Sequence, residues 1–114
     1  METKTFGQTL KNLRRSKGIT QRELASAVGV DFSYISKVEN NRMPPPAADT
    51  IVKICETLGI PPDKLLAMTR KMPTPVKEAI SENPIAQQFL REAQTMTLTN
   101  DEWETLTQQL KKLR

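Results

Sequence analysis

The groups in this sequence that could do chemistry are mostly hydroxyls, amides and cations, because the residue types on which most enzymes depend are scarce. The 114 residues include no histidine and one cysteine, Cys55. The commonest general base, the zinc-ligand spacings and an internal disulfide are therefore missing. The sequence also lacks a glycine-rich phosphate loop, a GxSxG elbow and paired carboxylates. We expect no enzymatic activity, no catalytic residues, no metal site and no cofactor.

Many of the hydrogen-bonding groups lie in a segment whose residue pattern predicts two short helices joined by a tight turn. Thr20 and Glu23 have the spacing of a capping box, in which each side chain binds a free backbone amide at a helix start. Gly29 can take the positive φ that ends this helix, and small Ala25 suits a helix crossing. Asp31 is expected to cap the second helix.

The second of these helices is expected to turn a polar side away from the core. Its apolar residues Ile35 and Val38 would hold it in place, with Tyr34 at the margin. A helix presented in this way fits the major groove of B-DNA, where polar side chains bind base edges. The outward residues are Phe32, Ser33, Ser36 and Lys37.

The charge distribution indicates that the first part of the chain meets a polyanion. Residues 1–70 contain 11 Lys and Arg against 7 Asp and Glu, whereas residues 71–114 contain 6 of each. The net charge of +4 therefore lies in the first part. There, a salt bridge from Arg14 or Arg15 to Glu39 is as reasonable an expectation as a phosphate contact.

The elements that position these groups are predicted to be short helices. Apolar residues recur at spacings of three and four, and no stretch alternates as a strand does. The predicted fold is all-α, with a five-helix DNA-binding domain over residues 1–70 and a three-helix tail over residues 71–114. Thr74, Asn83 and Thr99 are expected to cap the tail helices. The predicted helices are 5–17, 20–28, 32–40, 47–58, 62–68, 75–82, 84–94 and one beginning after Thr99.

Neither a targeting segment nor a membrane span is predicted. The start, METKTFG, is polar and charged, and no later run approaches the roughly 20 apolar residues of a membrane span. Apolar residues make up 37% of the chain, as in globular proteins with a packed core. We therefore expect a cytoplasmic protein without a membrane partner, in which Cys55 is a small apolar filler.

The segment GITQRELASAVGVDFSYISKVENNR, followed by ICETLGIPPDKLL, resembles the DNA-binding domain of the lambda repressor, Cro and XRE superfamily. The resemblance covers about residues 6–68. It implies a lambda-repressor-like fold, double-stranded DNA as partner and a role in transcription regulation. It also implies that Gln21 contacts a phosphate and braces the recognition helix, and that Phe32, Ser33, Ser36 and Lys37 face bases. The residues implied to follow the DNA backbone are Asn40, Asn41 and Arg42.

Two positions depart from the pattern of this superfamily. Asn41 stands where many relatives have glycine, and asparagine tolerates the left-handed conformation that such a helix end requires. Phe32 has no hydrogen-bonding atom at a position that faces bases. We expect it to contact thymine methyl groups or the sugars of the DNA backbone.

The last helix offers an apolar stripe that needs something to pack against. A segment of 44 residues with three short helices buries too little surface to be stable alone. Docking on the first domain is one solution, and pairing of two copies about a twofold axis is the one we favour. A homodimer would bind an inverted repeat whose half-sites lie about 34 Å apart. The stripe consists of Trp103, Leu106, Leu110 and Leu113.

The tail segments PTPVKEAI, SENPIAQQFLREAQTM and DEWETLTQQLKKL are similar in order to the C-terminal domain of DdrO-type repressors. This similarity implies a repressor that dimerises through its tail and is relieved when an ImmA/IrrE-like metalloprotease cuts it between Thr95 and Asn100. Two alternatives remain open at this point. One is an antitoxin whose tail covers a toxin, and the other is a phage or restriction-modification controller without a proteolytic step.

Overall fold

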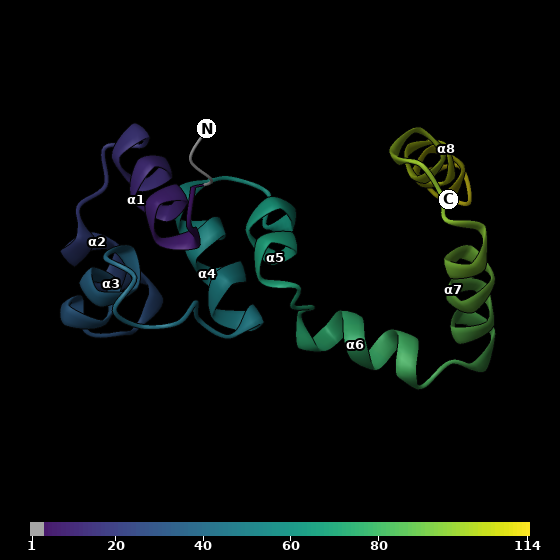
Figure 1. The fold of residues 1–114 in the computed structure, drawn as a ribbon, viewed down its shortest axis with the longest axis horizontal. Coiled ribbons are helices and arrows are strands. Elements are labelled where there is room, and N and C mark those ends of the chain that lie inside the picture. Colours follow the sequence, from purple (N-terminus) through teal and green to yellow (C-terminus); the bar gives the residue numbers. More distant parts are fainter. Residues whose placement is uncertain (1–3) are drawn as a thin grey trace. The chain divides into compact units, whose positions relative to one another are not determined.

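The computed structural model describes residues 4–114, so the first three residues of the predicted 1–70 domain lie outside it. The described chain consists of eight helices without a strand (Figure 1). They form two compact units, one ending at Thr74 and one running from Pro75 to Arg114. The helices are α1 (Phe6–Ser16), α2 (Gln21–Val28), α3 (Phe32–Glu39), α4 (Ala48–Leu58), α5 (Asp63–Thr69), α6 (Thr74–Ser81), α7 (Pro84–Met96) and α8 (Asn100–Lys111).

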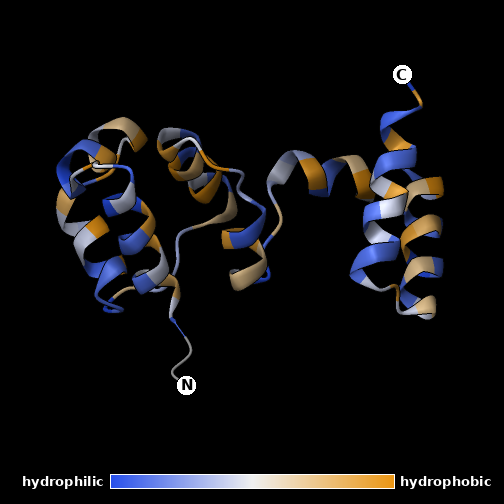
Figure 2. Ribbon diagram, turned by 90° about the horizontal axis from the view of Figure 1, so that it is seen from above, coloured by the Kyte–Doolittle hydropathy of each residue, from blue (hydrophilic) through white to orange (hydrophobic). Residues whose placement is uncertain are grey.

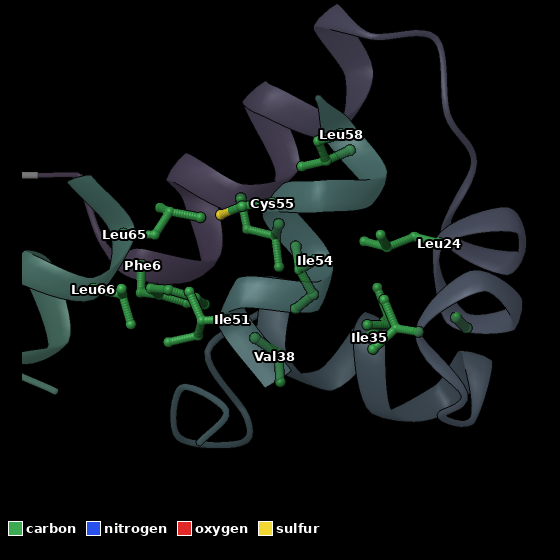
Figure 3. Close-up of a cluster of buried hydrophobic side chains, with 13 residues drawn as sticks. Phe6, Leu24, Ile35, Val38, Ile51, Ile54, Cys55, Leu58, Leu65 and Leu66 are labelled. Atoms are coloured by element: carbon green, nitrogen blue, oxygen red, sulfur yellow. The ribbon is translucent and has the colours of Figure 1, made fainter. Parts of the chain in front are cut away.

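The first unit has its own hydrophobic core, built by α1 to α5. Helix α4 packs against α2 and α5, and α3 packs against α2 and α1. Figure 3 shows the side chains of this core, which includes Cys55 at 0% exposure. Burial, with a smaller contribution from the nearby charge of Asp63, raises the pKa of the Cys55 thiol. The expectation that Cys55 is an apolar filler is therefore confirmed.

Local capping signals position most of the helix ends as the sequence predicted. The Thr20–Glu23 and Thr99–Glu102 capping boxes both form. Gly29 ends α2 at φ 85°, in the left-handed region that glycine adopts without strain. The Asn83 side chain accepts hydrogen bonds from the first amides of α7. The backbone of these segments is thus specified locally.

Two expectations about helix ends were wrong, and the one for Asp31 is confirmed in position only. Asp31 has the extended backbone of a cap residue, but its carboxylate makes no capping hydrogen bond. Thr74 is the first residue of α6 rather than its cap, and its hydroxyl donates to Oδ2 of Asp49 over 2.7 Å. The predicted stripe residue Leu113 lies beyond α8, which ends at Lys111.

Gly7 allows α1 to approach the end of α3 more closely than any other residue type would. A Cβ atom built on Gly7 would overlap the carbonyl oxygen of Val38 and lie 2.7 Å from that of Glu39. It would also lie 2.7 Å from Oδ1 of Asn41. Two of these atoms are backbone atoms, which cannot turn aside as a flexible side chain does. Gly7 therefore fixes where the C-terminal end of α3 lies.

We expect Gly7→Ala to lower the free energy of unfolding. Forcing a methyl group into a packed contact costs about 1–3 kcal/mol, whereas the gain in helix propensity is at most about 1 kcal/mol. The midpoint of urea unfolding should fall. Asn12→Ala, at an exposed position of the same helix, is the matched control and should leave the midpoint unchanged or raise it. A Gly7→Ala protein at least as stable as the wild type would contradict this account.

The second unit has almost no core of its own. Among residues 75–114, all of which the structure describes, Ala93 alone is buried. Figure 2 shows hydrophobic residues along both α7 and α8. Many of them are exposed, including Ile85 at 77% and Phe89 at 51%. No helix in the described chain is long and apolar enough to cross a membrane.

Candidate nucleic-acid interface

Helix α3 turns a polar side away from the core of the first unit. Its apolar residues Ile35 and Val38 are buried at 0% and 2% exposure, and Tyr34 packs against the core at its margin. The turn at Gly29 leads the chain from α2 into α3. The predicted base-facing residues all lie on the accessible side, where Ser36 is half-buried and the other three are exposed. These residues are Phe32, Ser33, Ser36 and Lys37.

A buried carboxylate ties α3 to α1 and α2. Nε of Arg14 donates to Oε2 of Glu39 over 2.7 Å, and Nη2 donates to Oε1 over 2.9 Å. The remaining Nη1 donates to the carbonyl oxygen of Ile19 over 2.8 Å. The side chain of Arg14 is only 9% exposed and that of Glu39 is 0% exposed. The hydrogen bond to Glu39 raises the pKa of Arg14. The predicted salt bridge is confirmed for Arg14.

Gln21 joins the same network from the first position of α2. Its Nε2 donates to Oε1 of Glu39 over 2.8 Å, so that Glu39 accepts from both preceding helices. Hydrogen bonds to a charged acceptor are stronger than those between neutral groups. Gln21 therefore braces α3, whereas its contact with a phosphate stays a prediction. Helix α3 is thus tied to α1 and to α2 through one buried carboxylate.

The chain leaves α3 through an exposed polar turn. Asn41 has a φ of 61°, the left-handed conformation expected of it. The amide of Arg42 then donates to the carbonyl oxygen of Lys37 over 2.8 Å. Asn40, Asn41 and Arg42 are all exposed. Their amide and guanidinium groups are accessible to a partner at the end of α3.

Beside α3 lies a cationic hollow of about 380 Å³ at the junction of α1 and α2. Its lining includes four basic side chains and the ring of Phe32. Arg14 is occupied by Glu39, which leaves three cations facing the hollow. They are Lys11, Arg15 and Arg22. A surface of this kind attracts phosphate groups.

Comparison with known proteins identifies the domain that carries this surface. A family model described as a helix-turn-helix domain matches residues 7–70. The chain belongs to this helix-turn-helix family. It thus has the fold of DNA-binding transcription regulators of the lambda-repressor type, a family of regulators and not of enzymes.

Several helix-turn-helix regulators are similar to the chain over this domain. The uncharacterised regulator RghRB of Bacillus subtilis is 35% identical over 77 residues, which cover 65% of the chain and 55% of RghRB. The transcriptional repressor RghR of the same organism is 37% identical over 62 residues, covering 54% of the chain and 46% of RghR. The crystal structure of SinR, a master regulator for biofilm formation, in complex with DNA matches with a TM-score of 0.51 and 34% identity. That match covers 54% of the chain and 98% of the SinR chain.

The chain spans about half the length of the curated relatives it matches. The matched segment of the family model ends at residue 70, before α6. The family is therefore shown for residues 7–70.

Beyond the helix-turn-helix domain, α7 and α8 form two apolar grooves. One groove of about 390 Å³ is lined by the four predicted stripe residues together with Phe89 of α7. Three of the four are well exposed, with Trp103 at 41%, Leu110 at 64% and Leu113 at 75%, and Leu106 is half-buried. The other groove, of about 350 Å³, includes Ala93, Met96 and Leu98.

Sequence reasoning missed several residues that the structure makes important. Gly7 had a usable signal, because an isolated glycine inside a helical pattern has a packing reason in many proteins. Phe89 and Met96 had the spacing of a helix face but were not connected with the stripe of α8. Arg22 had no signal, since its partner Phe32 lies ten residues away across a turn.

Proposed function

We propose that the chain is a transcriptional repressor that binds, as a homodimer, an operator made of two half-sites in inverted repeat. One observation carries the proposal: the exposed polar side of α3, held by the buried Arg14–Glu39 network. Two relatives support it, because RghR is a transcriptional repressor and SinR has been crystallised with DNA. Both are similar to the chain over the helix-turn-helix domain.

In this proposal α3 enters the major groove and the surrounding groups bind the DNA backbone. The Ser33 and Ser36 hydroxyls and the Lys37 ammonium group contact base edges, and Phe32 contacts a thymine methyl group. Gln21 from the head of α2 contacts a phosphate. Beyond α3, the backbone contacts come from Asn40, Asn41 and Arg42. The division follows the general rule that phosphate contacts position a protein while base contacts specify the sequence.

The second unit supplies the dimer contact. Two short helices with one buried residue between them cannot stabilise themselves, and the exposed groove at Trp103 offers an apolar surface for a second copy. A twofold axis would set the same surface of each copy against the other. The recognition helices would then lie about one turn of DNA apart. Relief by a metalloprotease stays a prediction, and the connection 97–99 is where a cut would separate α8 from α7.

Lys37→Ala and Ser33→Ala test the base contacts. Each variant should weaken binding to the specific site by about 1–3 kcal/mol, the range for a base contact, and leave non-specific binding largely intact. The site is recovered by selection from random-sequence duplex DNA, and affinities are measured at several salt concentrations. Lys64→Ala removes a positive charge from α5, which packs against α1 and α4. This variant should change neither specific nor non-specific binding. Equal losses on specific and non-specific DNA would instead place Lys37 or Ser33 on the phosphates.

A further inference from the structure

Arg22 and Phe32 form a stacked pair at the point where α2 and α3 come together. Cζ of Arg22 lies 4.3 Å from the centroid of the Phe32 ring. Arg22 is the second residue of α2 and Phe32 is the first residue of α3. The pair therefore links the beginnings of the two helices of the helix-turn-helix.

The stack restrains an aromatic ring that would otherwise be free to turn. Phe32 is 39% exposed, so the rest of the domain covers only part of it. Attraction between a guanidinium group and the face of the ring favours one orientation of the ring. A contact with a methyl group needs such a fixed ring, because ordering a mobile side chain on binding opposes association.

Stacking leaves the hydrogen-bonding edge of Arg22 available. Cζ of Arg22 lies over the ring of Phe32. The five N–H donors of a guanidinium group lie in its plane, so a contact through the face of the group leaves these donors free. Arg22 also borders the cationic hollow with Lys11 and Arg15. One side chain can therefore stack on Phe32 and donate to a phosphate at the same time.

We propose that Arg22 is a positioning residue for sequence recognition: stacked on Phe32, it directs the ring against a thymine methyl group and binds the phosphate beside that base. Arg22 itself contacts no base. It nevertheless contributes to the preference for thymine at one position of each half-site. This inference rests on the proposed DNA-binding function and assigns a role to Arg22.

The test compares DNA sites that differ by one methyl group. The wild-type protein first selects its site from random-sequence duplex DNA, and each thymine is then replaced by uracil, which lacks the methyl group. Replacement of one such thymine, in a single half-site, should weaken wild-type binding about fourfold, the effect of losing one apolar carbon from a contact. Phe32→Ala should bind the thymine and uracil sites equally.

Variants of Arg22 separate its stacking role from its charge. Arg22→Ala should weaken binding to all DNA and also lose most of the discrimination between thymine and uracil. Arg22→Lys keeps the charge without the planar group, so it should recover general affinity and not the discrimination. Arg15→Ala is the matched control, because Arg15 borders the same hollow. It should weaken all binding and retain the fourfold discrimination.

Three outcomes would overturn the inference. If Arg22→Ala discriminates thymine from uracil as the wild type does, Arg22 is a phosphate contact alone. If no thymine position matters to the wild type, Phe32 contacts no methyl group and the stack has nothing to direct. If the wild type enriches no sequence at all, the proposed function fails, and the inference fails with it.

Discussion

Glu39→Ala is expected to lower the free energy of unfolding by about 3–5 kcal/mol, the cost of breaking a buried ion pair from one side. The Glu39 carboxylate is fully buried and accepts three hydrogen bonds, two from Arg14 and one from Gln21. Removing it leaves the Arg14 guanidinium group charged in a site that is only 9% exposed. Domains of this size unfold at a total cost of about 5–15 kcal/mol. The loss is therefore a large part of the whole.

Urea unfolding of wild type, Glu39→Ala and a double variant measures this cost. Arg14→Met combined with Glu39→Leu replaces the pair by apolar side chains of similar size, an exchange that is neutral or stabilising in other proteins. The double variant should therefore be more stable than Glu39→Ala. Ordinary surface substitutions change the free energy of unfolding by up to about 0.5 kcal/mol. If Glu39→Ala stays within that range of the wild type, the ion pair does not stabilise the domain.

The double variant also separates stability from DNA binding. The Arg14–Glu39–Gln21 network orients α3 as well as stabilising the domain. If the double variant regains stability but binds the selected site poorly, the network orients α3 for binding in addition to stabilising the fold. If it binds as the wild type does, packing alone positions α3.

Deletion of residues 75–114 is expected to leave a folded monomer that binds the operator at least about 100-fold more weakly. Helices α1 to α5 have a core of their own, which the deletion does not touch. Cutting after Thr74 also retains its hydrogen bonds to Asp49. Two linked half-site contacts gain about 10²–10⁴ in avidity over one. Loss of the link therefore lowers affinity without removing a single base contact.

The deletion is checked by mass in solution, circular dichroism and operator affinity. Trp103→Ala in the full chain should also weaken dimerisation and operator binding. It removes the largest apolar side chain from the groove that Trp103 lines with Phe89 and Leu110. Glu104→Ala is the matched control, since Glu104 is exposed on the same helix and lines neither groove. Fusing residues 1–74 to an unrelated dimeric coiled coil should restore part of the affinity. A truncated protein that stays dimeric and binds like the full chain would disprove the role assigned to the tail.

Most helix ends and the inward-facing positions of α3 follow from short segments of the sequence. Capping boxes act over three residues and glycine ends a helix at its own position, so both are visible in a single segment. Thr20, Glu23, Gly29 and Asn41 were all assigned correctly for this reason. The inward positions of Ile35 and Val38 follow from the helical period in the same way.

Which distant groups meet depends on the packing of the whole domain. The sequence left open whether Arg14 or Arg15 pairs with Glu39, which lies 25 residues from Arg14. It gave no sign that Arg22 stacks on Phe32, or that Phe89 borders the groove of α8. Contacts of this kind depend on where helices cross and how far each is rotated about its axis. Those quantities are set by packing of the whole core and leave no periodic trace in any one segment.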